Sequence, residues 1–229
     1  MCGRILLTSS GQELAQAFDL AEAPDLFARF NIAPSQDALT LTASEGGRGL
    51  SPRRWGLVPS WAKDPSIGTR MINARSETAH SKPAFRDALR QRRCIVPANG
   101  FYEWTRNGRE RQPHWFRRRD EPLMAMAGLF ERWCSHETDD VFESFTILTT
   151  DANASVSPVH DRMPVLLRRA DFDAWLDPDE KDPERLRRLL VPCPDEWLES
   201  RLVSPRVNDP RNDDPECLLP PTEYQPSLF

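Results

Sequence analysis

Short apolar segments bounded by turn-forming residues are the feature that most limits how this chain can fold. Gly and Pro punctuate seven runs of four to seven residues, each with β-branched or aromatic content: 38–43, 93–97, 100–104, 114–117, 123–129, 144–149 and 164–168. Runs of this length and composition are typical of strands. The dipeptide Asn107-Gly108 separates residues 100–106 from 109–117 and predicts a hairpin turn. We therefore expect a largely antiparallel, barrel-like sheet.

Helical patterns are short and lie between these segments. Residues 9–19 carry an apolar helical face behind Ser9 or Ser10 as N-cap. Three further helices are expected, at 83–92, 171–176 and 183–190. The mixture predicts an α+β fold in which short helices flank the sheet. No internal repeat and no Gly- or Ser-rich linker divides the chain, so we expect one domain over 1–229, with a Pro-rich, irregular segment at 204–229.

The charge of the chain is unevenly distributed. The total of 30 Lys and Arg against 35 Asp and Glu gives a net charge of −5, which taken alone argues against a nucleic-acid partner. Residues 48–119, however, hold 17 basic and 5 acidic side chains, a net charge of +12. Such a block either solvates a surface or binds a polyanion, and the count does not separate the two.

Metal and membrane sites are not expected. The five cysteines are scattered without a CxxC pair, and the four histidines lack ligand spacing, so we expect no disulfide framework, no metal and no cofactor. No apolar run approaches the ~18 residues that cross a bilayer, and the first 30 residues lack a secretory pattern. We expect a soluble, monomeric protein of the cytoplasm.

The second residue has chemistry that no internal cysteine has. Initiator Met is generally removed before a small residue, which makes Cys2 an N-terminal 1,2-aminothiol. Its α-amine, with a pKa near 8, attacks an aldehyde to give an imine, and its thiol then closes a five-membered thiazolidine ring. Two alternatives stay open on this residue alone: a small buried side chain that begins a strand, and the nucleophile of an N-terminal-nucleophile amidohydrolase.

Six separated motifs indicate a family. They are MCGR at 1–4, NIAPSQ at 31–36, WGLVPSW at 55–61, INARSE at 72–77, RCIVPANGFYEW at 93–104 and VHDRMPVLL at 159–167. Together they resemble the SRAP family, the abasic-site processing proteins of the DNA-damage (SOS) response, from Cys2 to about Leu167. The resemblance implies a protein that recognises an abasic site in single-stranded DNA and links to it covalently through its N-terminal cysteine.

The resemblance also assigns catalytic roles. The family's nucleophile falls on Cys2, its sugar-contacting asparagine on Asn73, its catalytic glutamate on Glu103 and its histidine on His160. Their chemistry is suitable, because an imidazole exchanges protons near neutral pH and a carboxylate relays them to and from the amine. Each has a structural alternative: Asn73 holds a turn, Glu103 pairs with an arginine, and His160 caps a strand end.

DNA-binding residues are expected inside and around these motifs. Trp61 and Trp104 are candidates for stacking on bases, and Pro34 for a wedge at the break in stacking. Phosphate contacts are expected from four arginines and one hydroxyl: Arg4, Arg75, Arg86, Arg162 and Thr149. Trp55, beside a Gly in an expected strand, is assigned to the core.

Three function classes follow from these residues. The first is an abasic-site sensor that forms a thiazolidine DNA–protein crosslink through Cys2 and so shields the lesion, with lyase activity through an imine when the thiol is absent. The second is a thiol-dependent peptidase or amidohydrolase that uses Cys2, including self-removal of Met1. The third is a single-strand-binding module in which Cys2 is structural.

Overall fold

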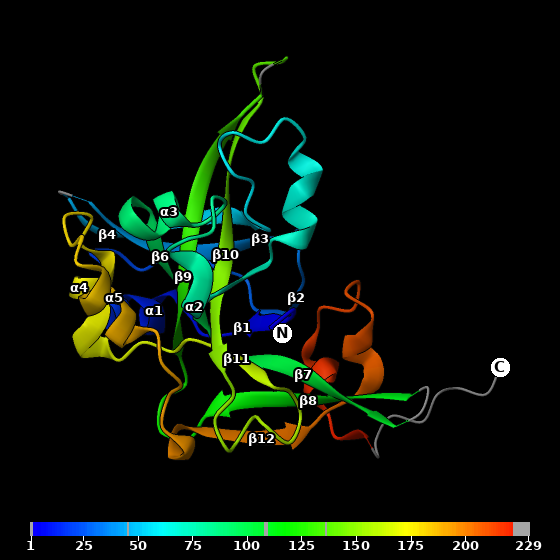
Figure 1. Ribbon diagram of the computed structural model, residues 1–229. Helices are drawn as coiled ribbons and strands as arrows, with labels where there is room; N and C mark the ends of the chain where they lie inside the picture. The colour runs from blue at the N-terminus through cyan, green and yellow to red at the C-terminus, as the bar shows by residue number, and fades with distance from the viewer. Residues whose placement is uncertain (1, 45, 108–109, 136, 222–229) are drawn as a thin grey trace.

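Five strands close into a barrel at the centre of the molecule (Figure 1). The computed structural model describes residues 2–44, 46–107, 110–135 and 137–221. Strand β10 pairs with both β4 and β9, and β3 and β6 complete the ring. The bounds are β3 Asp37–Ser44, β4 Gly47–Trp55, β6 Arg93–Ala98, β9 Met124–Cys134 and β10 Val141–Asp151. Among the five pairings of this ring, that of β10 with β4 is parallel and the other four are antiparallel, so the expected barrel-like, largely antiparallel sheet is confirmed.

Two three-residue strands flank the carboxyl end of β10. Strand β5 (Asn73–Arg75) pairs with it in parallel, and β11 (Arg162–Pro164) pairs with it antiparallel. Thr149 of β10 lies opposite Arg75 on one side and Pro164 on the other. The INARSE and VHDR motifs therefore meet at this end of β10, although about 85 residues separate them in the chain.

A second, antiparallel sheet lies beside the barrel in the strand order β12-β8-β7-β1-β2 (Figure 1). Its bounds are β1 Ile5–Leu7, β2 Arg29–Ile32, β7 Gly100–Asn107, β8 Glu110–Arg118 and β12 Leu198–Leu202. Strands β7 and β8 form the expected hairpin, with Asn107 opposite Glu110; the turn predicted at Asn107-Gly108 lies partly outside the described residues. Alternate residues of β7 face opposite sides, so Phe101 packs into the main core while Tyr102 packs into a separate cluster.

The segment after β12 covers the outer face of this second sheet. Val207 and Cys217 are buried against Leu6 and Tyr102, and the Asp213 carboxylate accepts hydrogen bonds from the backbone of β2. The segment contains two short 3-10 turns, η4 (Pro205–Asn208) and η5 (Pro215–Leu218), and otherwise lacks regular structure. The expected irregular character is therefore found over residues 204–221; residues 222–229 lie outside the described part.

The helices are short, as expected, and three of the four lie close to their predicted positions. They are α1 Gly11–Phe18, α4 Phe172–Leu176 and α5 Pro183–Leu189. Ser10 caps α1 in a reciprocal capping box with Glu13, and Asp182 caps α5. The helix expected at 83–92 begins only at Arg86 (α3, Arg86–Gln91). A further one-turn helix, α2 (Ser76–Ala79), follows β5 and was not expected.

One strand was placed wrongly from the sequence. The apolar run 164–168 is buried, but strand β11 ends at Pro164, and beyond it only Leu166 forms an isolated bridge, with Met126. Core packing rather than strand pairing accounts for this run. Trp55 is confirmed as a core residue: its side chain is 1% exposed and its indole N–H donates to the Ile72 carbonyl at 2.9 Å. In the described ranges, no helix combines the length and apolarity needed to span a bilayer.

Candidate active site

The N-terminal strand brings Cys2 between the two sheets. In the pairing of β1 with β7, Ile5 lies opposite Phe101, and the Tyr102 N–H donates to the Arg4 carbonyl at 2.9 Å. Continuing this register toward the N-terminus places Gly3 opposite Glu103. Cys2 itself has no exposed surface. The second residue of the chain is therefore fixed beside the FYEW motif by ordinary sheet pairing.

Glu103 is a buried carboxyl group on the barrel side of β7. It is 4% exposed, and burial raises its pKa from 4.5 to about 7. The pKa of the Cys2 thiol is also raised. Burial is the larger cause, and the negative charge of Glu103 is the second. Near neutral pH the site thus holds a protonated thiol beside a carboxyl group that is able both to give and to accept a proton.

Asn73 joins the barrel to the N-terminal segment. It begins β5, which pairs with β10, and its Nδ2 donates to the Cys2 carbonyl at 2.7 Å. Its Oδ1 is buried and has no hydrogen-bond partner in the part of the chain that the structure describes. A buried acceptor without a partner is costly in a finished core, so this oxygen is suited to a donor that a substrate supplies.

His160 lies in the loop that enters β11. Its Nδ1 accepts a hydrogen bond from the Arg162 backbone N–H at 2.9 Å, which places the proton of the neutral ring on Nε2. Nδ1 also lies 2.8 Å from an Asp161 carboxylate oxygen, a contact that becomes favourable when the ring is protonated. Because the Arg162 backbone N–H can only donate, it favours an unprotonated Nδ1 and so the neutral imidazole. Burial also favours the neutral imidazole, since it lowers the pKa of His160.

Arg162 is occupied by carboxylates of the protein. Its Nη1 contacts Glu77 and Asp151, each at 2.6 Å, and its Nη2 contacts Glu77 at 2.9 Å and the Thr149 carbonyl at 2.7 Å. Both terminal nitrogens are therefore engaged in tying α2 to β10 and β11. The phosphate contact expected from the sequence would compete with these bonds, and in this structure Arg162 positions the loop that carries His160.

Trp104 lies on the opposite side of β7 from Glu103 and is fixed in place. Its indole N–H donates to Asn208 at 2.6 Å, and the Arg4 and Arg111 guanidinium carbons lie 5.7 and 5.4 Å from its ring centroid. Arg4 in turn donates to the Val207 carbonyl at 2.7 Å. Sequence reasoning missed Arg111 and Asn208, because only the β7–β8 hairpin and the folded C-terminal segment bring them to Trp104.

The remaining expected DNA contacts are dispersed. Trp61 is 56% exposed and Arg75 is exposed at the end of β5, as a surface contact requires. Pro34 is half-buried ahead of Ser35, whose φ of 71° turns the chain sharply. Thr149 is fully buried, and its Oγ1 has no hydrogen-bond partner among the described residues.

Two sequence expectations remain: the DNA contact of Arg86 and the absence of a metal site. Arg86 lies on α3, contacts Asp87 at 3.4 Å and lines a separate cavity, so it does not join the residues around Cys2. Within the ranges given above, no three His, Cys, Asp or Glu side chains converge as a metal-ligand set.

Comparisons with known proteins relate the whole chain to a family. The model of the SOS response associated peptidase (SRAP) family matches residues 1–210. The chain is 39% identical to the abasic site processing protein YoqW of Bacillus subtilis, over 95% of this chain and 99% of that one. It is 36% identical to the abasic site processing protein HMCES of Gallus gallus, over 78% of this chain and 59% of that one. A crystal structure of a Bacteroides thetaiotaomicron protein superposes with a TM-score of 0.84 at 25% identity, covering 96% of this chain and 99% of its own.

Proposed function

Because the chain belongs to the SRAP family, we propose that it processes abasic sites in single-stranded DNA by forming a thiazolidine crosslink through Cys2. The observation that carries the proposal is the placement of Cys2 beside Glu103 and Asn73, with a carboxyl group whose pKa is about 7. Removal of Met1 would put the α-amine on the same residue as the thiol. The proposal therefore requires a mature chain that begins at Cys2.

The first step is imine formation. The α-amine adds to the aldehyde carbon C1′ of the open deoxyribose and gives a carbinolamine, which loses its hydroxyl as water. The neutral amine attacks, Glu103 takes the proton that the nitrogen loses once the N–C bond has formed, and it gives that proton to the leaving hydroxyl, a pair of transfers that suits a group titrating near neutrality. One amine and one aldehyde become one imine and one water.

The second step closes the ring. The Cys2 sulfur adds to the imine carbon while the thiol proton passes by way of Glu103 to the nitrogen. The product has C1′ bonded to both nitrogen and sulfur. Loss of the imine matters because an imine at C1′ makes the C2′ proton acidic, and β-elimination would then break the strand. Capture by the thiol thus shields the lesion.

His160 and Asn73 act on the sugar in this scheme. An abasic deoxyribose reacts only as the open aldehyde, so a proton has to move from the ring hydroxyl to the ring oxygen. The protonated ring of His160, which the Asp161 carboxylate 2.8 Å from Nδ1 would stabilise, is able to give its Nε2 proton to the ring oxygen and to take up the proton that the hydroxyl loses. The buried Oδ1 of Asn73 accepts a hydrogen bond from the sugar, while its Nδ2 holds the Cys2 carbonyl.

Single-strand binding would come from aromatic rings that lie outside this centre. Trp61 offers an exposed ring for stacking, worth about 1 to 3 kcal/mol per base. Trp104 offers a second ring, already oriented by Asn208 and by two guanidinium groups, so little side-chain entropy is lost on contact with DNA.

The test is a denaturing gel with an oligonucleotide that carries one abasic site. The wild-type protein is expected to give a heat-stable shifted band and an intact strand. Cys2→Ala retains an N-terminal amine, so we expect strand cleavage, no heat-stable band, and a band only after borohydride reduction of the imine. An undiminished heat-stable band from Cys2→Ala would exclude the thiazolidine mechanism.

Two controls separate the other function classes. Intact-mass measurement is expected to show a chain without Met1, and a retained Met1 would exclude the amine chemistry. Self-removal of Met1 by the Cys2 thiol predicts that Cys2→Ala keeps Met1 when expressed in cells without methionine aminopeptidase activity. Binding to abasic DNA without any covalent product would leave only the single-strand-binding module.

A further inference from the structure

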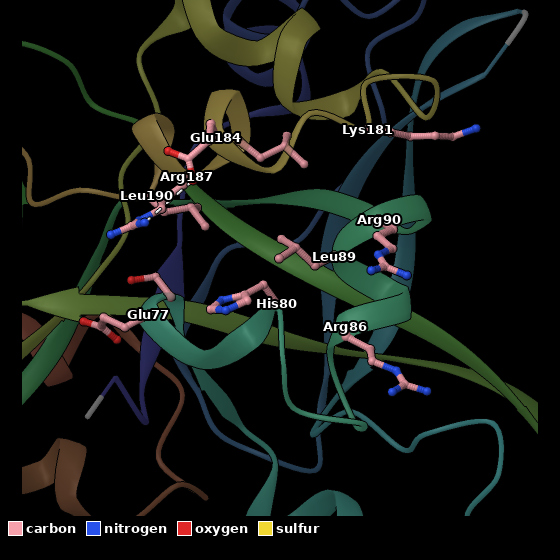
Figure 2. Close-up of a pocket in the computed structure, with 11 residues that line it drawn as sticks. Glu77, His80, Arg86, Leu89, Arg90, Lys181, Glu184, Arg187 and Leu190 are labelled. Atoms are coloured by element: carbon pink, nitrogen blue, oxygen red, sulfur yellow. Dashed lines mark ion pairs between the residues drawn. The ribbon is translucent and has the colours of Figure 1, made fainter.

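A cavity of about 180 Å³ is lined by residues of α2, α3 and α5 (Figure 2). Its floor is aliphatic: Leu89 of α3 and Leu190 after α5 face each other across it, with the buried Leu186 beside them. Of the proposed catalytic residues and their direct partners, only Glu77 lines it, through its pairing with Arg162. The cavity is therefore a neighbour of the reactive site and not part of it.

The rim of this cavity carries cations whose charge is not compensated. Arg90 and Lys181 both line it, and in the described residues neither forms an ion pair within 4.0 Å. The two carboxylates of the lining are already engaged, because Glu77 pairs with Arg162 and Glu184 lies 3.7 Å from Arg187. In Figure 2, Arg90 and Lys181 lie at one end of the cavity and Glu77 lies at the other. An anionic ligand is the charge complement of this rim.

A buried arginine fixes the walls at their present separation. Arg93, 4% exposed, donates to the carbonyls of Leu89 and Arg90 at the end of α3, at 2.7 and 2.9 Å. The same guanidinium donates to the backbone carbonyl of Trp175 at the end of α4 and to the backbone carbonyl of Glu180, which directly precedes Lys181. The α3 wall and the Lys181 wall are thus held by one side chain.

We propose that this cavity docks a short acidic peptide that carries one apolar anchor residue. The anchor side chain occupies the leucine floor, and carboxylates of the peptide contact Arg90 and Lys181. The lining favours a peptide over a nucleotide, because the floor is aliphatic and the only ring in the lining is the imidazole of His80, whereas nucleobases are held mainly by stacking on aromatic rings. Attachment here would leave Cys2, Asn73 and Glu103 uncovered for DNA.

The test is fluorescence anisotropy with a labelled ten-residue peptide that contains four Asp residues followed by Leu-Phe. We expect saturable binding that weakens as salt rises, and at least tenfold weaker binding to the double variant Arg90→Glu, Lys181→Glu. Arg188→Glu is the matched control, because Arg188 is exposed on α5 and does not line the cavity. Binding to the control is expected within twofold of wild type. A peptide with Asn in place of Asp, or Ala in place of Leu-Phe, is expected to bind at least tenfold less.

Crosslinking and competition measurements complete the test of peptide docking. Abasic-DNA crosslinking by the double variant is expected at the wild-type rate, so the result does not depend on the chemistry proposed for Cys2. The milder Arg90→Ala, Lys181→Ala variant replaces the double variant if circular dichroism shows a disturbed fold. The proposal is overturned by absent peptide binding, by equal binding to wild type and double variant, or by competition in which unmodified single-stranded DNA displaces the peptide and loses affinity for the double variant. That last outcome would assign the cavity to DNA.

Discussion

At the scale of single residues, the site depends on groups whose burial is unfavourable to stability. Glu103 is nearly inaccessible to solvent and keeps a raised pKa, and Asn73 has a buried oxygen without a partner among the described residues. Both features cost folding free energy and are typical of functional sites, where residues are selected for reactivity. Substitution at these positions is therefore expected to separate stability from activity.

Glu103→Gln tests that separation. Folded Glu103 holds its proton up to pH of about 7, whereas in the unfolded chain the proton leaves near 4.5, so stability falls as pH rises between these values. Gln carries no charge, and we expect the variant to be more stable than wild type at pH 8, by up to about 3 kcal/mol, with the gain vanishing toward pH 4.5. Urea unfolding at several pH values measures this.

The same substitution is expected to slow crosslink formation about 100-fold at pH 7, since the proton relay is lost. Glu22→Gln, at an exposed position, serves as the control and is expected to change neither quantity. A stability difference between Glu103→Gln and wild type that stays constant from pH 5 to 8 would show that Glu103 does not titrate in this range.

At the scale of elements, segments with an apolar, β-branched run were predictable and segments without one were not. Strands β6 to β10 lie where such runs predicted them, and α1 begins at a capping box that the sequence displays. Strand β4 was missed although it has nine residues, because Gly, Pro and three arginines interrupt its apolar pattern. Strands β1, β2, β5 and β12 have only three to five residues and were also missed. Such strands exist because a neighbouring strand is already in place, and a local pattern of three residues carries no comparable signal.

The site shows the same division. The sequence proposed Cys2, Asn73, Glu103 and His160 because each lies inside a motif, and the structure brings Cys2, Asn73 and Glu103 together through β1, β5 and β7. The pairing of Arg162 with Glu77 and Asp151 was not predictable, because it joins three elements and depends on how α2 packs against β10. An arginine in a motif looks the same in sequence whether it contacts a phosphate or a carboxylate.

Arg93→Met tests how much the Arg93 side chain stabilises the fold by joining the ends of α3 and α4. Its guanidinium satisfies carbonyls at the ends of both α3 and α4, groups that have no partner within their helices. Met has similar length and no donors, so we expect a loss of about 3 kcal/mol in unfolding free energy. Arg90→Met, at an exposed neighbour, is expected to cost less than about 0.5 kcal/mol. Equal effects of the two substitutions would contradict this role for Arg93.

At the scale of the whole molecule, the basic block of residues 48–119 is not a continuous basic surface. Its cations spread over the barrel, α3 and the second sheet, and among the described residues seven of them pair with carboxylates: Arg48, Arg53, Arg86, Arg92, Arg117, Arg118 and Arg119. Arg93 is buried among carbonyls. The partner of Arg86, Asp87, lies inside the block, whereas the other six arginines pair with carboxylates elsewhere in the chain, which therefore neutralise part of the +12 charge within the fold.

Single-strand binding should accordingly depend only moderately on salt. If about three phosphates are contacted, the slope of log affinity against log salt is about −2, since single strands contribute about 0.7 per contact. Anisotropy with an unmodified oligothymidine between about 50 and 300 mM KCl measures the slope. A slope near −6 or steeper would show that DNA displaces the internal ion pairs and engages most of the block.

The C-terminal segment that supports Arg4 and Trp104 also sets the order in which the site is completed. Arg4 bonds to Val207, Trp104 to Asn208 and Asn31 to Asn212, so each contact joins residues that lie more than 100 positions apart in the chain. None of these bonds exists until residues 207–212 have been synthesised. During translation the segment that holds Cys2 therefore lacks this support, and the proposed site is assembled late.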